Sequence, residues 1–344
     1  MKLAIIGSGI SGIGAALALS ERHDVVLLER DTRLGGHANT VEIDYPHPKG
    51  GLRNIAVDTG FIVYNRKTYP NLCSLFAHLN VPTEWSDMSL SFSVDGGRTE
   101  WAADNVDKVF AQRSNLLRPN FLRAVSEILR FNKCASETLE SCGNDDETLG
   151  AWLDRNRFGE AFRKIYLYPM AGAIWSTRSD DIAEFPARAL FGFYKNHDLL
   201  IGIGDAVQWR TVVGGSREYV RRAAQALGPR IRLGVDVWKV EPTHPGVMVH
   251  IKGEESERFD GVVLATHSDQ ALALNSDAEP QTRHLLESIR YTANRAVLHR
   301  DPSLMPKRQK CWSSWNTRVG VGAEKTGASL TYWMNRLQNI DRDM

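Results

Sequence analysis

The chain has no excess of charge of either sign. Its 42 lysines and arginines are balanced by 41 aspartates and glutamates, which gives a formal net charge of +1. Nucleic-acid-binding domains usually carry a clear excess of basic residues on one face. The charge balance therefore gives no reason to expect a nucleic-acid partner.

Cysteines are few, and their spacing excludes the usual patterns of cysteine chemistry. The four are Cys73, Cys134, Cys142 and Cys311. None forms a C-x-x-C pair or lies at a metal-ligand distance in sequence from a histidine, so we expect no metal site. Isolated thiols are typical of a reducing compartment, and the sequence predicts a cytoplasmic protein.

Long apolar runs are also missing, since none approaches the roughly 20 residues that a membrane-spanning helix needs. The most apolar stretch is residues 3–19, LAIIGSGISGIGAALAL. It could be read as a signal peptide, but its four glycines disfavour the helical core of such a peptide. We expect it to be part of the fold.

The first thirty residues read as a βαβ unit. Residues 2–6, KLAII, are a short apolar run typical of a buried parallel strand. A glycine-rich segment follows at 7–12, then a helical pattern from 13 to 22, and a second strand-like run at 25–28. The glycines thus lie at the first strand-to-helix turn, where dinucleotide-binding folds have their G-x-G-x-x-G pattern.

Each residue of this turn has a physical task in binding a dinucleotide. Gly7 permits the tight turn, Gly9 lets the backbone approach the pyrophosphate, and Gly12 lets the helix pack closely on the strand. The helix N-terminus directs free N–H groups and a partial positive charge at the phosphates. Glu29 is placed to accept hydrogen bonds from the adenosine ribose. The predicted contacts of this unit are Gly7, Gly9, Ile10, Ser11, Gly12, Glu29 and Arg30.

A second glycine pair follows at once, in the stretch RDTRLGGH at 30–37. It resembles the second fingerprint of the large flavoprotein superfamily that includes amine oxidases, protoporphyrinogen oxidase and phytoene desaturases. In that superfamily the motif usually ends Gly-Gly-Arg and approaches the pyrophosphate again, which implies the same for Gly35, Gly36 and His37. Because His37 replaces the arginine, it would be a weaker phosphate partner than a guanidinium.

The stretch DTGFI at 58–62 extends this resemblance. It looks like the superfamily's segment that brings backbone beside the isoalloxazine ring of the flavin. The resemblance implies cofactor contacts from Thr59, Gly60, Phe61 and Ile62. An ordinary turn before a strand is the alternative interpretation.

A run of strand-like segments later in the chain resembles the superfamily's return to the cofactor domain. The segments are 231–240, 246–251 and 259–266. In the superfamily the position of Val237 contacts adenine through its backbone, and the stretch GVVLATHS at 261–268 matches a buried strand that ends near the cofactor. Together these resemblances favour FAD over NAD as the cofactor.

Further blocks are similar to one branch of the superfamily, bacterial FAD-dependent amine-oxidase-like proteins often encoded beside a cyclopropane fatty-acid synthase. The blocks lie at 58–72, 87–94, 111–119, 168–176, 208–220 and 265–272. Superfamily members normally finish with a strand, a glycine-rich turn and a helix that closes over the flavin. This sequence ends at Met344 after a strand-like run at 329–333, so we expect a chain that lacks the closing segment.

The expected fold class is α/β, a Rossmann-like FAD/NAD(P)-binding domain with an inserted α+β substrate domain. The FAD-binding domain is expected to be discontinuous, at 1–75 and 208–344, with the substrate domain at 76–207. Residues 88–101 alternate around Asp95-Gly96-Gly97 in the manner of a β-hairpin.

Residues 104–142 are helical in pattern, with Phe121, Val125, Ile128 and Leu129 on one face. The stretch 108–133 is basic, and a basic amphipathic helix can lie on an anionic bilayer, which makes peripheral membrane contact one hypothesis. A solvated helix packed on its own sheet is the other.

No catalytic constellation stands out in the sequence. Candidate walls of a substrate pocket are Tyr166, Tyr168, Trp175 and Trp209, although aromatic residues more often belong to a core. His197, His267 and His299 could serve in acid–base chemistry, but their spacing singles out none. We therefore predict no particular catalytic residue.

The leading functional hypothesis is an FAD-dependent oxidoreductase that removes a hydride from an amine or an apolar, lipid-like substrate. Flavin carries the redox chemistry in such enzymes, so a dedicated protein base is not required. Two alternatives stay open: an NAD(P)-dependent dehydrogenase, and a non-catalytic flavin- or lipid-binding protein of the same fold, as GDP-dissociation inhibitors exemplify. The sequence does not indicate the oligomeric state.

Overall fold

The computed structural model of the chain describes residues 1–47, 49–141, 146–175, 179–200, 207–291, 293–320 and 328–340. The chain divides into two compact units. The first comprises Met1–Val63, Pro70–Glu84 and Thr211–Val297, and the second comprises Tyr64–Tyr69, Trp85–Arg210 and Leu298–Met344. Because the chain alternates between the units, each is assembled from segments far apart in the sequence.

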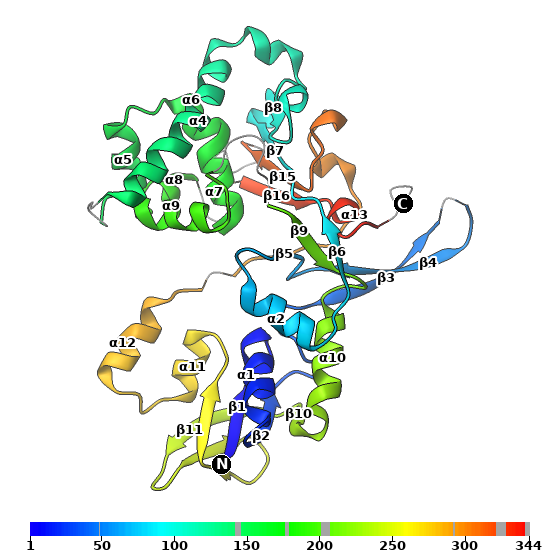
Figure 1. The fold of residues 1–344 in the computed structure, drawn as a ribbon, viewed down its shortest axis with the longest axis vertical. Coiled ribbons are helices and arrows are strands. Elements are labelled where there is room, and N and C mark those ends of the chain that lie inside the picture. Colours follow the sequence, from blue (N-terminus) through cyan, green and yellow to red (C-terminus); the bar gives the residue numbers. More distant parts are fainter. Residues whose placement is uncertain are drawn as a thin grey trace. The chain divides into compact units, whose positions relative to one another are not determined.

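The first unit is built on a four-stranded parallel sheet in the order β10-β2-β1-β14 (Figure 1). Its strands are β1 (Lys2–Ile6), β2 (Asp24–Glu29), β10 (Ile231–Leu233) and β14 (Gly261–Leu264). The long helices of this unit are α1 (Ile10–Ser20) and α10 (Arg217–Leu227). A three-stranded antiparallel sheet joins β11 (Val237–Pro242), β12 (Val247–Ile251) and β13 (Glu257–Phe259).

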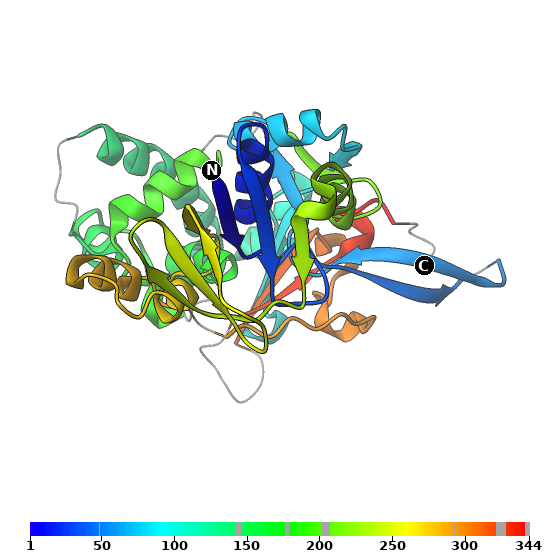
Figure 2. The ribbon, with the colours of Figure 1, turned by 90° about the horizontal axis from the view of Figure 1, so that it is seen from below.

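Alternate residues of β1 belong to two separate hydrophobic clusters, which places the parallel sheet in the middle of the unit. Leu3 and Ile5 pack in a cluster with residues of α1 and α10. Ala4 and Ile6 pack in another cluster with residues of β11, β12 and β13. The parallel sheet is therefore covered by helices on one face and by the antiparallel sheet on the other (Figures 1 and 2).

Further elements of the first unit are a long antiparallel hairpin and three helices. They are β3 (Thr40–Pro46), β4 (Leu52–Asp58), α2 (Pro70–His78), α11 (Ser268–Leu274) and α12 (Pro280–Ser288). Figure 2 shows the β3–β4 hairpin as an extended blue ribbon. Another sheet, in the order β5-β9-β6, contains strands where the chain passes between the units: β5 (Val63–Asn65), β6 (Thr83–Ser86) and β9 (Trp209–Val212).

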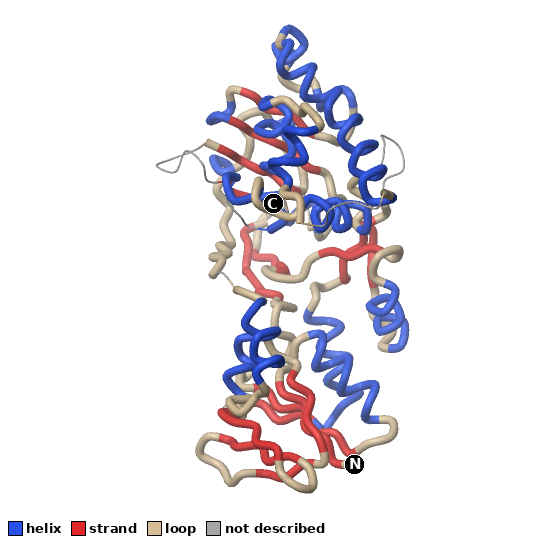
Figure 3. Tube along the Cα trace, turned by 90° about the vertical axis from the view of Figure 1, so that its left-hand side faces the viewer, coloured by secondary structure: helices blue, strands red, loops and turns tan. Residues whose placement is uncertain are grey.

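The second unit combines a four-stranded sheet with a group of helices, as the tube in Figure 3 shows. The sheet has the order β16-β15-β7-β8, with β7 (Leu90–Val94), β8 (Thr99–Ala102), β15 (Trp315–Val319) and β16 (Ala328–Tyr332). The longer helices are α4 (Pro119–Glu140), α5 (Leu149–Arg155), α7 (Tyr168–Trp175) and α9 (Ala187–Asn196). The short ones are α3 (Val106–Val109), α6 (Glu160–Phe162), α8 (Ser179–Ile182) and α13 (Met334–Leu337).

The structure also contains several short helical turns. They are η1 (Asp95–Gly97), η2 (Arg113–Leu117), η3 (Arg163–Leu167), η4 (Gly228–Arg230), η5 (Pro302–Leu304) and η6 (Gln309–Cys311). The core of the second unit is largely aromatic, and Phe92, Trp101, Phe131, Trp152 and Phe191 are all nearly or fully buried in it.

The predicted hairpin at 88–101 is confirmed, because β7 and β8 pair antiparallel around η1. The helical pattern at 104–142 is divided into α3, η2 and α4. The apolar residues that the pattern places on one face are not equally buried: Phe121 is buried, but Leu129 is more than half exposed. None of the described helices has the length and apolar character to cross a membrane.

The two units differ from the predicted domain boundaries mainly at the C-terminal end. We expected residues 208–344 to belong with the N-terminal strands, whereas Leu298–Met344 falls in the second unit. The reason is visible in the pairing of β15, which runs parallel to β7 and antiparallel to β16 in the sheet of that unit. Which domain binds which ligand stays a prediction.

Candidate functional site

The glycine-rich turn after β1 is held by close backbone packing. Gly7 has φ +99°, and its N–H donates to the carbonyl of Leu28 at 2.9 Å. A Cβ on Gly12 would lie 1.8 Å from the Gly7 carbonyl oxygen, and a Cβ on Gly7 would lie 2.8 Å from that of Ala265. Gly7 and Gly12 are therefore required by the tight turn and by the close approach of α1, as their spacing predicts.

Gly9 stands in a different environment. A Cβ added to Gly9 would meet no atom within 4 Å, although the residue directly precedes α1. No side chain caps this helix end, and its first turn holds no acidic residue. The N–H groups of the first turn and the positive end of the helix dipole thus face a place where an anion could approach the backbone.

The second glycine pair lies against the first. A Cβ on Gly36 would be 3.2 Å from the Cα of Gly9, and Gly35 N donates to the carbonyl of Ser8 at 3.0 Å. Gly35 and Gly36 have φ values of +108° and +54°. The two glycine loops are separate in the sequence, but in the structure they form one surface without side chains beside the N-terminus of α1. We call this surface, made by Gly9 and Gly36, the glycine cradle.

Glu29 points back to the same turn. Its Oε2 accepts hydrogen bonds from Ser8 N at 2.8 Å and from Ser8 Oγ at 2.6 Å, and its Oε1 accepts from Asp31 N at 2.9 Å. Ser8 is almost wholly buried. The carboxylate is thereby fixed at the end of β2 beside the glycine-rich turn, and its role in holding a ribose stays a prediction.

The segment at 58–62 joins the second glycine loop. Phe61 N donates to the carbonyl of His37 at 2.9 Å, and Thr59 N donates to that of Asn39. A Cβ on Gly60 would lie only 2.0 Å from the His37 carbonyl oxygen. Gly60 is therefore needed for this contact, which brings the predicted residues Thr59 to Ile62 beside residues 37–39.

Asp58 anchors the segment. Its carboxylate accepts hydrogen bonds from Thr40 Oγ1 at 2.6 Å and from Ser216 N and Oγ at 2.9 and 2.7 Å. Burial raises the pKa of this carboxyl, and these hydrogen bonds oppose the effect. Ser216 directly precedes α10, so Asp58 ties that helix to the β3–β4 hairpin.

The remaining predicted contacts lie at the rim of this region. Ile10 and Arg30 are exposed, and Ser11 is exposed in the first turn of α1. Val237 begins β11, two residues after Val235, whose N–H donates to the carbonyl of Glu29 at 2.9 Å. The structure thus brings the predicted residues together in the first unit, around the glycine cradle.

Sequence reasoning missed Ser8 and the ring stack around His267. Ser8 links Glu29 to Gly35, but a serine between two glycines carries no signal of such a bond. The His267 ring stacks on Tyr291 at 4.3 Å between centroids and lies 5.5 Å from that of His37. The expectation that 261–268 is a buried strand is corrected in part, because every residue of β14 is half-buried.

The candidate pocket aromatics belong to the second unit. Tyr166 is buried in the aromatic core against Phe92 and Trp101, and its burial raises its pKa. Tyr168 and Trp175 pack on the same core, and Trp209 begins β9. His197 stacks on Phe193, and His299 accepts a hydrogen bond from Asp301 N.

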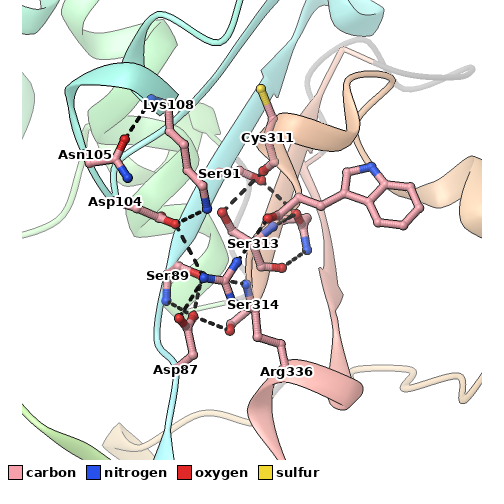
Figure 4. A network of polar contacts seen from close by, with 12 residues as sticks. Asp87, Ser89, Ser91, Asp104, Asn105, Lys108, Cys311, Ser313, Ser314 and Arg336 are labelled. Carbon is pink, nitrogen blue, oxygen red and sulfur yellow. Dashed lines mark hydrogen bonds and ion pairs between the residues drawn. The ribbon is translucent and has the colours of Figure 1, made fainter. Parts of the chain in front are cut away.

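The second unit also contains a dense polar network, which Figure 4 shows. The Asp87 carboxylate accepts hydrogen bonds from Ser89, from Ser314 Oγ at 2.7 Å and from Arg336 at 2.8 Å. Burial alone would raise the pKa of Asp87, but these hydrogen bonds and the Arg336 charge outweigh it and lower the pKa. Since both carboxylate oxygens are occupied, the network fastens α13 and residues 313–314 to the start of β7.

Comparisons with known proteins identify the family. Residues 10–302 match the family described as flavin containing amine oxidoreductase. AofH of Mycobacterium tuberculosis (strain ATCC 25618 / H37Rv), whose name describes a flavin-containing monoamine oxidase, is 23% identical over 83% of this chain. The chain spans 61% of the length of that relative.

Solved structures show the same fold. Cyclohexylamine oxidase from Brevibacterium oxydans IH-35A matches with a TM-score of 0.63 and 23% identity, over 83% of this chain and 62% of that one. Putrescine oxidase bound to putrescine matches at 0.60 with 20% identity, over 83% and 63% of the two chains. A fatty acid isomerase from P. acnes matches at 0.55 with 16% identity, over 83% and 63%.

These likenesses agree with the α/β fold expected for an FAD-binding domain with a second, mixed unit. The family match begins at Ile10, after β1, Gly7 and Gly9. It includes Gly12 and the second glycine loop and ends at Pro302, where η5 begins. The chain belongs to the flavin-containing amine oxidoreductase family.

Proposed function

We propose that this protein is an oxidoreductase that uses FAD to remove a hydride from an amine or from an apolar, lipid-like substrate. Members of its family are FAD-dependent oxidoreductases, and membership implies an FAD cofactor. The observation that carries the proposal is the glycine cradle, where backbone free of side chains lies beside the N-terminus of α1.

The residues present fit a dinucleotide. The space around Gly9 is open, and the adjoining helix end offers N–H groups and a partial positive charge to a pyrophosphate. Glu29 would bind the adenosine ribose, and Gly36 would let the second loop approach the phosphates. Val237 would contact the adenine through its backbone, and the backbone of Thr59 to Ile62 would lie beside the isoalloxazine ring.

When bound, FAD supplies the redox chemistry by accepting a hydride from a C–H bond of the substrate. The chain's own residues bind and orient: the helix end counters phosphate charge, Glu29 fixes the sugar, and Gly60 permits the close backbone approach. We assign no catalytic residue, because hydride transfer to a flavin can proceed without a dedicated protein base.

The substrate class rests on two kinds of support. Two structural neighbours are named for amines, cyclohexylamine and putrescine, and a third is named for a fatty acid. The sequence blocks shared with proteins often encoded beside a cyclopropane fatty-acid synthase favour a role in lipid metabolism. Cys73, Cys134 and Cys311 are free thiols, which supports a cytoplasmic location.

The absorption spectrum of purified protein tests the cofactor. Protein expressed with excess flavin should be yellow, with bands at about 370 and 450 nm, and should release FAD on denaturation. Anaerobic addition of cyclohexylamine, putrescine or oleate should bleach the band when the right class is offered. Colourless protein would contradict the proposal, and bound flavin that none of these compounds reduces would favour a non-catalytic binding protein.

We also propose peripheral membrane contact through residues 108–133. An apolar corner is exposed where η2 meets α4: Leu117 is 86% exposed, and Leu116 and Leu122 are exposed beside it. Arg113, Arg118 and Arg123 flank this corner. Arg118 donates to the carbonyl of Arg98 and pairs with no carboxylate among the described residues, so its positive charge suits an anionic bilayer.

Sedimentation with lipid vesicles tests the membrane contact. The protein should bind vesicles that contain phosphatidylglycerol more than vesicles of phosphatidylcholine alone. Leu117→Ser should weaken binding roughly ten- to hundredfold, because burying a leucine contributes about 1.5–3 kcal/mol. The matched control is Leu285→Ser, which changes a leucine of the first unit that is 60% exposed. Equal loss in both variants would contradict the assignment.

A further inference from the structure

The second unit contains a cavity that no part of the proposed function uses. Its volume is about 370 Å³, and it is lined by Arg66, Lys67, Trp85, Asp198, Val207, Gln208 and Arg210. Three of these side chains are cations and one is an anion, so the lining carries a net charge of +2. Small-molecule pockets are mostly apolar, and a lining this basic points to an anionic ligand. We call it the Arg66 pocket.

A short turn holds two of the cations in place. The wholly buried Asn65 accepts hydrogen bonds through its Oδ1 from Thr68 N at 2.8 Å and from Thr68 Oγ1 at 3.0 Å. An asparagine side chain that accepts from the backbone N–H three residues on is typical of a residue that caps the start of a helical turn. Arg66 and Lys67 occupy the two central positions of the turn, so their backbone is ordered before any ligand arrives.

Lys67 is already paired. Its Nζ lies 2.6 Å from both carboxylate oxygens of Asp198, which stands two residues beyond the end of α9. Arg66, by contrast, makes no hydrogen bond or ion pair within the part of the chain that the structure describes. The neighbouring cation is thus neutralised, whereas the Arg66 charge is available to a ligand.

Arg210 and Trp85 form another part of the lining. They come from the adjacent strands β9 and β6, and the Arg210 guanidinium lies 4.5 Å from the centre of the Trp85 ring. Trp85 is 55% exposed. A guanidinium over an indole face is attracted to the ring, so this contact places the positive charge of Arg210 beside the exposed Trp85 ring.

We propose that the Arg66 pocket binds a small organic anion, whose carboxylate or phosphate is held by Arg66 and Arg210 while Trp85 contacts its apolar part. Guanidinium groups bind both kinds of oxyanion through paired hydrogen bonds, so the shared chemistry is that of a planar or tetrahedral oxyanion. All the residues that line the pocket belong to the second unit, and all those proposed to hold FAD belong to the first.

Calorimetric titration of the full chain tests the proposal with two probes, inorganic phosphate and hexanoate, at constant ionic strength. At least one should bind saturably. Arg66→Gln should weaken that binding roughly tenfold, since a charged hydrogen bond is lost, and Arg66→Lys should retain part of it. The matched control is Arg157→Gln, which removes the same charge from an exposed arginine of the same unit and should leave binding unchanged.

A variant that binds the probe more tightly than the unmodified protein gives a result that misfolding cannot cause. Asp198→Asn removes the only carboxylate of the lining and frees Lys67, so it should tighten binding by roughly three- to tenfold. Binding of phosphate alone would identify a phosphate ligand, and binding of hexanoate alone a carboxylate with an alkyl chain. Binding of neither probe, or equal effects of the Arg66 and Arg157 variants, would overturn the proposal. The absorption spectrum of bound flavin reports separately on the first unit.

Discussion

At the scale of single residues, three glycines of the first turn are present for different physical reasons. Gly7 has a positive φ, Gly12 leaves no room for a Cβ, and Gly9 has neither constraint. The backbone of Gly9 has φ −64° and ψ −176°, a conformation that any residue can adopt. Neither packing nor strain in the protein itself explains a glycine there, which agrees with the proposed approach of a pyrophosphate to its backbone.

Replacing Gly9 with alanine should therefore separate stability from cofactor binding. Gly9→Ala should change the free energy of unfolding without flavin by less than about 0.5 kcal/mol. The new Cβ would stand in the path of the pyrophosphate, and overpacking of about 1–3 kcal/mol corresponds to roughly ten- to hundredfold weaker FAD binding. Urea denaturation and flavin fluorescence titration measure the two quantities.

Two other glycines of the same helix supply controls. Gly14→Ala, where a Cβ also meets nothing within 4 Å, should stabilise α1 by about 0.5–1 kcal/mol and leave FAD binding unchanged. Gly12→Ala should destabilise the fold by about 1–3 kcal/mol or more, because its Cβ would overlap the Gly7 carbonyl. If Gly9→Ala binds FAD as well as Gly14→Ala does, the glycine cradle is not the pyrophosphate site.

The residue scale also shows where sequence reasoning succeeds. The positions of Gly7, Gly12 and Glu29 could be predicted because their tasks are set by neighbours within one βαβ unit. The contact between Gly36 and Gly9 could be expected only by resemblance, since no local rule brings the two loops together. The bonds of Ser8 and the position of Ala265 against Gly7 depend on the folded sheet and leave no local pattern.

At the scale of elements, the start of α10 is stabilised by charge. Glu218, in its first turn, accepts hydrogen bonds from Arg221 at 2.7 and 2.9 Å and from Arg222 at 2.7 Å. The bond from Arg221 is the main cause that lowers the pKa of Glu218 from 4.5 to about 2. A carboxylate near a helix N-terminus is favourable in itself. This helix end matters to the site because Ser216, next to it, binds Asp58.

The stabilisation by Glu218 should depend on pH. A folded-state pKa below the ordinary value means that the contribution is fully present above pH 4.5 and is lost as the pH falls toward 2. Glu218→Gln should therefore lower the free energy of unfolding by up to about 1 kcal/mol at pH 7, the range of surface pairs, and the difference should shrink in acid.

Urea denaturation at neutral and acidic pH checks this dependence. Glu160→Gln is the control, because Glu160 makes one exposed pair with Lys164 at 3.5 Å, and its effect should be small at every pH. A deficit of the Glu218 variant that stays constant between pH 4.5 and 2 would show that the loss does not come from the charge.

The helices and strands differ in how much of their pairing and burial could be predicted from the sequence. The hairpin β7–β8 follows from alternation and a glycine turn, which are local signals. The exposure of Leu129 on α4 could not be predicted, because a helical period fixes which residues share a face but not how wide the buried strip is. Tyr166 is a second example. Its ring lies in the hydrophobic core, but the sequence alone was also compatible with a position in the wall of a substrate pocket.

At the scale of the whole molecule, the tryptophans are distributed unevenly between the two units. Eight of the nine, all except Trp238, fall in the second unit. The residues proposed to hold FAD are all in the first unit. Tryptophan fluorescence therefore reports mainly on the second unit, and flavin fluorescence reports on the unit that contains the proposed FAD contacts.

Thermal unfolding at increasing FAD concentrations, followed by both tryptophan and flavin fluorescence, should show different shifts of the two transitions. A ligand at a hundred times its Kd stabilises the folded state by about 2.7 kcal/mol. For a unit of this size, that corresponds to a rise in Tm of roughly 5–10 °C. The flavin-release transition should rise with FAD concentration, and the tryptophan transition should rise less, since all the proposed FAD contacts lie in the first unit. A flavin-release temperature that does not change with FAD concentration would contradict the proposed site. Equal shifts of the flavin and tryptophan transitions would show that the two units unfold in one cooperative step.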